Sequence, residues 1–309
     1  MRTNGLLMFL ALALAATLSV GAGLASPVQS ARRSRADQNI EAIGHRKIAR
    51  GINVYSPEKE IERGKALSEQ VERSAKMLSD PALNGYVGRV AHKVAQNSDS
   101  DIPIQVRVID SEEVDACTLP GGYLYVTVGL LLQLESEGEL ASVLARGIAH
   151  TALRSAARLA TRANLLQPAG SHFDGLGQLD MCANSSGLPF IFLAMRRRVE
   201  LEADYFGVQY IYKSGYEPDT FIRLLQHVRP TNQPSSISTS SAFSPFPPPL
   251  ERVKALRKEI ADLFPRRENS IVSTVEFEEF RGRLRALTPE KPPNEKPSAP
   301  TLVRHTVPQ

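Results

Sequence analysis

The sequence predicts an α+β fold that is mainly helical, with one small antiparallel sheet. Helical periodicity dominates both ends of the folded region, whereas apolar and polar residues alternate within residues 102–127. An order of helices, then strands, then further helices is typical of α+β domains rather than of repeated βαβ units. The chain has 309 residues, 42% of them hydrophobic and 23% charged, so it is long and apolar enough to bury a core.

The first two helices are predicted from their start signals. Ser56 and Asp80 are each followed by a proline, which places a capping side chain directly before a proline in the first turn. We therefore expect helices at 57–78 and 81–95. The alternation that follows predicts strands at 102–110, 114–119 and 123–127, the last two joined by the turn Pro120-Gly121-Gly122.

The second half of the body is predicted to be helical. Residues 138–166 contain Gly147 as the one helix-breaking residue after the initial Gly138, and we expect one long core helix there. A Gly/Ser/Asn-rich loop at 167–187 leads to a second long helix at 188–214. Shorter helices are expected after Pro218 and at 250–263 and 276–287, with a Ser/Pro-rich stretch at 230–249 between them.

The two ends of the chain predict export and flexible flanks. Residues 6–25 are apolar, follow Arg2 and end in small residues, as in a cleavable signal peptide at 1–25. An uncleaved membrane anchor is the alternative, since about 20 apolar residues can span a bilayer. A polar linker is expected at 26–47, the folded domain at 48–287, and a disordered Pro-rich tail at 288–309. The mature protein is expected to be periplasmic or secreted.

Composition limits the chemistry that the chain can perform. The net charge of +4 comes without a dense basic stripe, so no nucleic-acid partner is expected. Two cysteines exclude a cysteine-based zinc cluster, but six histidines leave room for a His/carboxylate metal site. Export would allow a Cys117–Cys182 disulfide; a free buried thiol at Cys117 is an equal alternative.

Four polar residues on two of the predicted helices form a candidate constellation. Residues four apart on a helix face the same way, so Arg146 and His150 share one face, and Glu200 and Asp204 share another. If the two helices pack together, these side chains converge. The simpler interpretation is a hydrogen-bonded core histidine and a solvated, salt-bridged helix face.

Three longer segments favour the interpretation that these four side chains converge. They read TLPGGYLYVTVGLL, ELASVLARGIAHTALRSAARL and ELEADYFGVQYIYKSGYEP. In this order they resemble the BepA- and HtpX-like zinc metallopeptidases of the CAAX-prenyl-endopeptidase family, over about residues 53–262. The resemblance implies a helical gluzincin fold around a small sheet. It also implies an edge strand that pairs with extended polypeptide, at Tyr123, Leu124, Tyr125, Val126 and Thr127.

The family's zinc site requires HExxH on one helix and the glutamate of ExxxD on another. Here the first motif reads RGIAH. By this resemblance Arg146 stands at the first histidine ligand and Gly147 at the general base. His150 and Glu200 match the remaining ligands, and Asp204 matches the carboxylate that would orient His150.

These replacements predict a vestigial metal site with no intact catalytic residue. A guanidinium has no lone pair for a metal, and glycine has no proton acceptor, so no cofactor is expected. We expect Arg146 to act as a surrogate cation that pairs with Glu200 and with Asp204. The alternative is that Arg146 turns outward and leaves the pocket collapsed or wet.

The function predicted from the sequence is that of a pseudopeptidase. It would bind unfolded or extended polypeptide in envelope protein quality control, as part of an envelope protein complex, with membrane contact only through an uncleaved signal segment. The alternative is an active zinc metalloendopeptidase that recruits another ligand, for which His172 has the best reach. A third interpretation is a partner subunit that uses its Pro-rich tail as a binding segment.

Overall fold

A computed structural model describes residues 34–165, 190–228 and 249–288. The chain divides into two compact units, Met1–Asn39 and Ile40–Gln309. In the first unit, the short helix α2 (Arg35–Gln38) begins at Ser34 with a capping box between Ser34 and Asp37. The second unit contains all the candidate site residues. The predicted signal peptide and residues 289–309 of the predicted tail lie outside the described residues.

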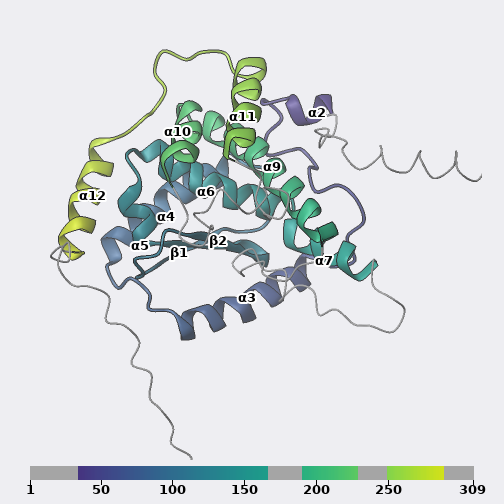
Figure 1. Cartoon of the computed structure of the whole chain (residues 1–309), viewed down its shortest axis with the longest axis horizontal. Coiled ribbons are helices and arrows are strands. Elements are labelled where there is room, and N and C mark those ends of the chain that lie inside the picture. Colours follow the sequence, from purple (N-terminus) through teal and green to yellow (C-terminus); the bar gives the residue numbers. More distant parts are fainter. Residues whose placement is uncertain (1–33, 166–189, 229–248, 289–309) are drawn as a thin grey trace, which may run out of the picture. The chain divides into compact units, whose positions relative to one another are not determined.

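The second unit confirms an α+β class that is mainly helical (Figure 1). Before the sheet come α3 (Pro57–Ser74) and α4 (Pro81–Gln96). After it come α5 (Val128–Gln133), α6 (Glu137–Ala152), α7 (Ser155–Leu165), α9 (Phe190–Lys213), α10 (Asp219–His227), α11 (Pro249–Leu263) and α12 (Val275–Leu287).

The capping residues start α3 and α4 where the sequence predicts. The Ser56 side chain accepts a hydrogen bond from the Lys59 amide, and Asp80 accepts from the amides of Ala82 and Leu83. Helix α3 ends at Ser74 rather than at residue 78, because the chain beyond it pairs with the sheet. There the Leu78 amide donates to the Val108 carbonyl at 2.9 Å.

The sheet differs from the prediction in its topology. Its strands are β1 (Gln105–Ile109), β2 (Ala116–Leu119) and β3 (Tyr123–Thr127), in the spatial order β1-β3-β2. Strand β3 pairs parallel with β1 and antiparallel with β2, so the sheet is mixed rather than antiparallel. The prediction that 123–127 form an edge strand is wrong.

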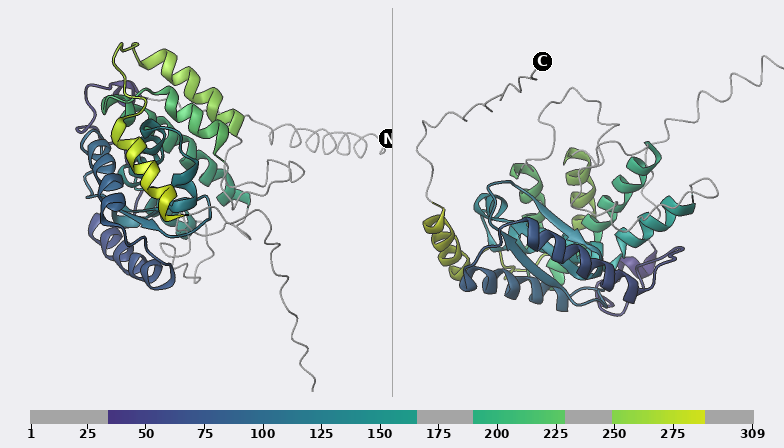
Figure 2. Two further views of the ribbon diagram at one scale, coloured as in Figure 1. Left: turned by 90° about the vertical axis from the view of Figure 1, so that its left-hand side faces the viewer. Right: turned by 90° about the horizontal axis from the view of Figure 1, so that it is seen from below.

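The position of β3 follows from two different pairings. The turn at 120–122 joins β2 to β3, and the two strands pair antiparallel. The connection at 110–115 joins β1 to β2, and β1 pairs parallel with the other side of β3. The edges are therefore β1 and β2. Figure 1 shows α3 on one side of the sheet and α6 and α9 on the other, and the view from below in Figure 2 shows α3 in front of the sheet.

The predicted long helix at 138–166 is broken into α6 and α7. Arg154 lies between them with a left-handed backbone, φ 52°. Its guanidinium Nε donates to Glu60 Oε1 at 2.6 Å, and its Nη2 donates to the Tyr55 carbonyl at 2.7 Å. These contacts with the start of α3 favour a break where the sequence contains neither proline nor glycine.

The fold of the second unit begins before residue 48. Ile43 and Ile48 are buried in its main hydrophobic core, and Arg46 forms a buried salt bridge with Asp99 at 2.6 Å. The predicted linker is therefore wrong from residue 40 onward, since these residues pack as part of the domain.

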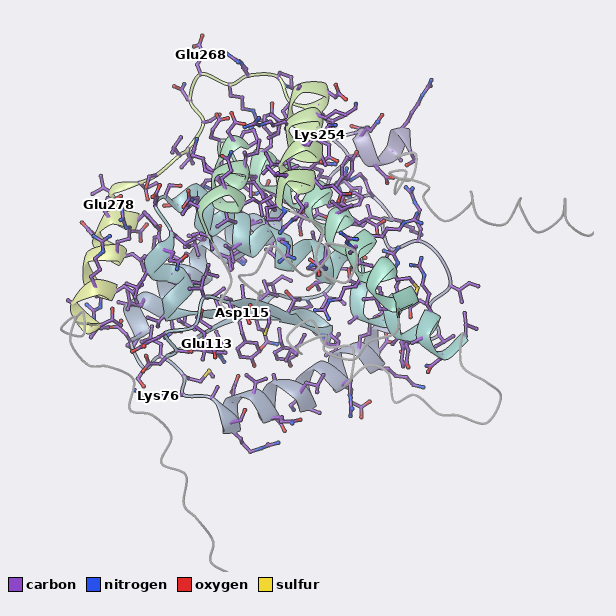
Figure 3. All side chains as sticks on the ribbon, in the orientation of Figure 1. Lys76, Glu113, Asp115, Lys254, Glu268 and Glu278 are labelled. Carbon is purple, nitrogen blue, oxygen red and sulfur yellow. The ribbon has the colours of Figure 1, made fainter. Side chains whose placement is uncertain are left out.

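The outer surface of the second unit carries charged side chains. Lys76, Lys254 and Glu278 are exposed there (Figure 3).

Cys117 in β2 is disulfide-bonded, whereas its expected partner, Cys182, lies outside the described residues. Within the described ranges, no helix combines the length and apolar character needed to cross a membrane.

Candidate functional site

Helices α6 and α9 pack against each other and bring the predicted constellation together (Figure 1). Gly207 on α9 allows this close approach. A Cβ atom at position 207 would lie 3.3 Å from the Arg146 backbone nitrogen and 3.4 Å from its Cα. The first helix thus presents Arg146 and His150 to Glu200 and Asp204 on the second.

Arg146 turns inward and pairs with Glu200, as the sequence predicts. The Arg146 Nη2 donates a hydrogen bond to Glu200 Oε2, and Arg146 Nε lies 3.5 Å from Asp204 Oδ1. The Glu200 side chain is 0% exposed and that of Arg146 is 23% exposed. The alternative of an outward-turned arginine is wrong.

The charge of Glu200 is set by its neighbours. Burial on its own would raise the pKa of the Glu200 carboxyl group. The positive charge of Arg146, helped by His150 and Arg196, outweighs burial and holds this pKa well below its usual range. Glu200 is therefore a buried carboxylate whose main counter-charge is Arg146.

His150 and Asp204 do not contact each other in the expected way. The buried His150 ring hydrogen-bonds through Nδ1 to Ser155 Oγ at 3.2 Å, and its Nε2 lies 3.5 Å from Glu200 Oε2. Asp204 instead accepts two hydrogen bonds from Arg252 on α11, at 2.6 and 2.7 Å. Ser155, rather than Asp204, orients the imidazole, so the role predicted for Asp204 is wrong.

Arg252 is a site residue that sequence reasoning missed. Burial lowers the pKa of its guanidinium, but the pair with Asp204 outweighs burial and raises this pKa above its usual value. The fork of two hydrogen bonds ties α11 to α9 directly behind the constellation. The one sequence signal for Arg252 is that PPPLERVKAL, at residues 247–256, also fits the family that the three longer segments resemble.

Side chains from the sheet fill the space beside Gly147. A Cβ atom at this position would lie 2.7 Å from Leu124 Cδ2 and 2.9 Å from Thr118 Oγ1. Contacts this short require neighbouring atoms to move. The position that would carry the general base is thus closed by β2 and β3 as well as lacking a carboxylate.

The residues present do not fit a zinc centre. His150 Nε2 and Glu200 Oε1 are buried polar atoms with no hydrogen-bond partner within the described residues. Catalytic zinc sites nevertheless use three protein ligands and an open position. Arg146 supplies a fixed positive charge on Glu200 where the third ligand would be needed.

A small pocket lies next to His150 at the end of β2. It is lined by Thr118 and the turn at 119–121, by the junction of α6 and α7, and by Glu60 from α3. Burial raises the pKa of the Glu60 carboxyl group, against the opposing charge of its partner Arg154. The pocket connects the edge of the sheet with the vestigial ligand His150.

These features define a metallopeptidase-type fold in which Arg146 and Gly147 stand at the positions that the resemblance gives to a metal ligand and to the general base. The sequence profile of peptidase family M48 matches residues 81–260, and the chain belongs to this family. The resemblance inferred from the sequence is confirmed.

Relatives of the chain carry two kinds of name. The chain is 26% identical over 195 residues to the beta-barrel assembly-enhancing protease of Escherichia coli K12, covering 58% of this chain and 40% of the relative. A Vibrio cholerae relative, also named for beta-barrel assembly enhancement, is 30% identical over 193 residues, 57% of this chain and 40% of the relative. The mitochondrial metalloendopeptidase OMA1 of Schizosaccharomyces pombe is 30% identical over 191 residues, 60% and 55% of the two chains. The match thus spans about 40% of the length of these bacterial relatives.

Proposed function

We propose that this member of family M48 is a pseudopeptidase, which binds extended polypeptide and does not hydrolyse it by zinc chemistry. The observation that carries the proposal is the buried Arg146–Glu200 ion pair at the position of the first metal ligand. A water molecule on zinc is the nucleophile in such enzymes, and a carboxylate beside it takes its proton. This chain offers neither a third ligand nor that carboxylate.

The size of the expected defect follows from the general base alone. Loss of a positioned base slows hydrolysis by about 10²–10⁴-fold even where the metal is retained. The cation at Arg146 adds repulsion of any divalent metal. We therefore propose that peptidase turnover is absent or strongly impaired. The alternative, an active zinc metalloendopeptidase, is tested by the first experiment below.

The structure supports β2, rather than β3, as the strand that receives a polypeptide. One side of β2 pairs with β3, and no other strand of the described residues pairs with its outer side. A strand at the edge of a sheet can accept a further strand from an extended polypeptide.

The names of the relatives support the proposed setting. Two bacterial relatives are named as enhancers of beta-barrel assembly. We propose that this chain is exported to the periplasm and acts in envelope protein quality control, in a complex with other envelope proteins. Because the relatives are longer than the matched part, their activities are carried over to this chain only as proposals.

The first experiment measures zinc content and casein cleavage of the purified protein, with the His150→Ala variant as its control. The expected result is no cleavage, and a zinc content that the His150→Ala substitution leaves unchanged. Zinc and cleavage that are both lost in His150→Ala would instead show an active metallopeptidase.

A second experiment tests the binding edge by amide hydrogen exchange with an unfolded outer-membrane protein fragment. Amides of β2 are expected to gain protection, and those of the opposite edge, β1, serve as the internal control. Protection of β1 alone, or of neither edge, would contradict polypeptide binding at β2.

A further inference from the structure

A second cluster of metal-binding side chains lies away from the α6–α9 constellation. One ligand atom from each of Glu135, Glu139 and His227 lies within 4.8 Å of the other two. Glu135 precedes α6, Glu139 lies in its first turn, and His227 is the last residue of α10. Glu139 is seven residues before Arg146, roughly 10 Å along the helix axis, so the two sites are separate.

One tautomer of His227 offers a ring nitrogen to a cation. Nδ1 lies 2.9 Å from the Arg223 carbonyl oxygen, and the tautomer with its proton on Nδ1 donates to that oxygen. In this tautomer the lone pair of Nε2 faces the Gln133 carbonyl oxygen at 3.2 Å and Glu139 Oε2 at 3.6 Å. Three acceptors facing one another repel unless a positive charge lies among them.

Glu139 provides an independent observation that points to a ligand. Its side chain is 1% exposed. Oε2 accepts a hydrogen bond from the Glu135 amide at 2.7 Å, but Oε1 has no hydrogen-bond partner within the described residues. A buried carboxylate oxygen without a donor is unfavourable, and a bound cation would satisfy it.

We propose that Glu135, Glu139 and His227 bind a divalent metal ion, and that Zn²⁺ suits this donor set. One imidazole nitrogen and two carboxylates are ligands that zinc accepts at tetrahedral sites, with water as the fourth ligand. The hydrogen bond from Nδ1 to a backbone carbonyl is the outer contact that metal-bound histidines commonly make. The ion would hold the end of α10 against the start of α6.

The test is zinc titration of the metal-free protein by calorimetry, followed by thermal unfolding with and without zinc. The wild-type protein is expected to bind one equivalent with loss of binding in His227→Ala and Glu139→Gln. The loss should exceed the roughly 10–100-fold effect of removing an outer contact of a metal site. His150→Ala is the matched control and should bind zinc as the wild type does.

Glu135→Gln keeps the proposal testable if the buried variants fail to fold. Glu135 is exposed, so this variant should unfold at the wild-type temperature without zinc while its zinc affinity falls. Equal zinc affinity in the wild type, Glu135→Gln and His227→Ala would overturn the proposal. So would a wild-type protein that binds no zinc and shows by NMR an imidazolium at His227 paired with Glu139.

Discussion

At the scale of single residues, Arg146 provides the counter-charge that the buried Glu200 carboxylate requires. Glu200 is fully buried, and a buried carboxylate without a counter-charge is strongly destabilising. A guanidinium supplies that charge permanently, whereas a metal must first be bound. Arg146 thus keeps the Glu200 carboxylate compensated without a metal.

The ion pair makes the protein sensitive to Arg146. The Arg146→Met variant should lose about 3–5 kcal/mol of unfolding free energy, because Glu200 is left buried without its partner. Urea unfolding of the purified variant measures this loss. The double variant with Glu200→Leu should be closer to the wild type, and equal losses in the two variants would argue against the pair.

Gly147 offers a second prediction at the same scale. Replacing a helical glycine with alanine usually stabilises by about 1 kcal/mol. At position 147 the added methyl group meets Leu124 and Thr118, so Gly147→Ala should instead destabilise by about 1–3 kcal/mol.

Gly88 on α4 is the matched control for this prediction. A Cβ atom at position 88 would have nothing within 4 Å, so Gly88→Ala should show the ordinary gain. Equilibrium unfolding of both variants under one set of conditions makes the comparison. A stabilised Gly147→Ala would mean that the sheet does not close this position.

The sequence predicts the part of the site that local spacing determines. Arg146, His150, Glu200 and Asp204 could be assigned because residues four apart share a helix face and the motifs match a family. Arg252 and Leu124 could not be assigned in this way. Each reaches the site from another element, and a local sequence pattern does not show how that element packs. The prediction that Asp204 orients His150 was wrong for the same reason, because its actual partner, Arg252, comes from α11.

At the scale of elements, local signals fix boundaries and long-range contacts fix neighbours. Capping residues started α3 and α4 correctly, and the bounds of β3 were predicted without error. The place of β3 in the centre of the sheet was not predicted, because apolar and polar residues alternate in the same way in a central strand and in an edge strand. The break at Arg154 was missed since it depends on contacts with Glu60 and Tyr55 from a distant segment.

The contact between α4 and α12 carries a prediction about pH. A hydrogen bond from Arg283, together with the amides of α4, lowers the pKa of the Asp80 carboxyl group. A lowered pKa means that this contact stabilises the fold above the unfolded pKa of aspartate, about 3.9. The contribution is lost as the pH falls through the lower folded value.

Arg283→Ala should therefore raise the pKa of Asp80, and NMR titration of its carboxyl carbon measures the change. Arg281→Ala, which removes a contact within α12 to Glu278, should leave that pKa unchanged. An Asp80 pKa that is equally low in Arg283→Ala would assign the shift to the helix amides alone.

At the scale of the whole molecule, the chain belongs to family M48, and Arg146 and Gly147 stand where the resemblance places a histidine ligand and the general base. Helices α6 and α9 pack together and hold the four residues of the constellation. The two positions lie in one turn of α6, and Leu124 and Thr118 of the sheet face the second of them. A partial return of metal binding should therefore be separable from a return of activity.

Arg146→His tests this separation. With His150 and Glu200 it completes three ligands, so the variant should bind one more equivalent of zinc than its parent. Casein should remain uncleaved because Gly147 provides no base. Elemental analysis and the cleavage assay are best made in a His227→Ala background, so that the second proposed site contributes no zinc. An unchanged zinc content would mean that the pocket has diverged beyond its ligands.

The closeness of Leu124 and Thr118 to Gly147 also bears on how peptidase chemistry could be introduced into this chain. A glutamate placed at position 147 alone would collide with the sheet, and a smaller residue at position 124 alone would leave a void. Neither first step toward an active enzyme would be favoured while the other is missing. In the proposed pseudopeptidase, packing as well as chemistry would oppose a gain of activity, which would require helix and sheet to change together.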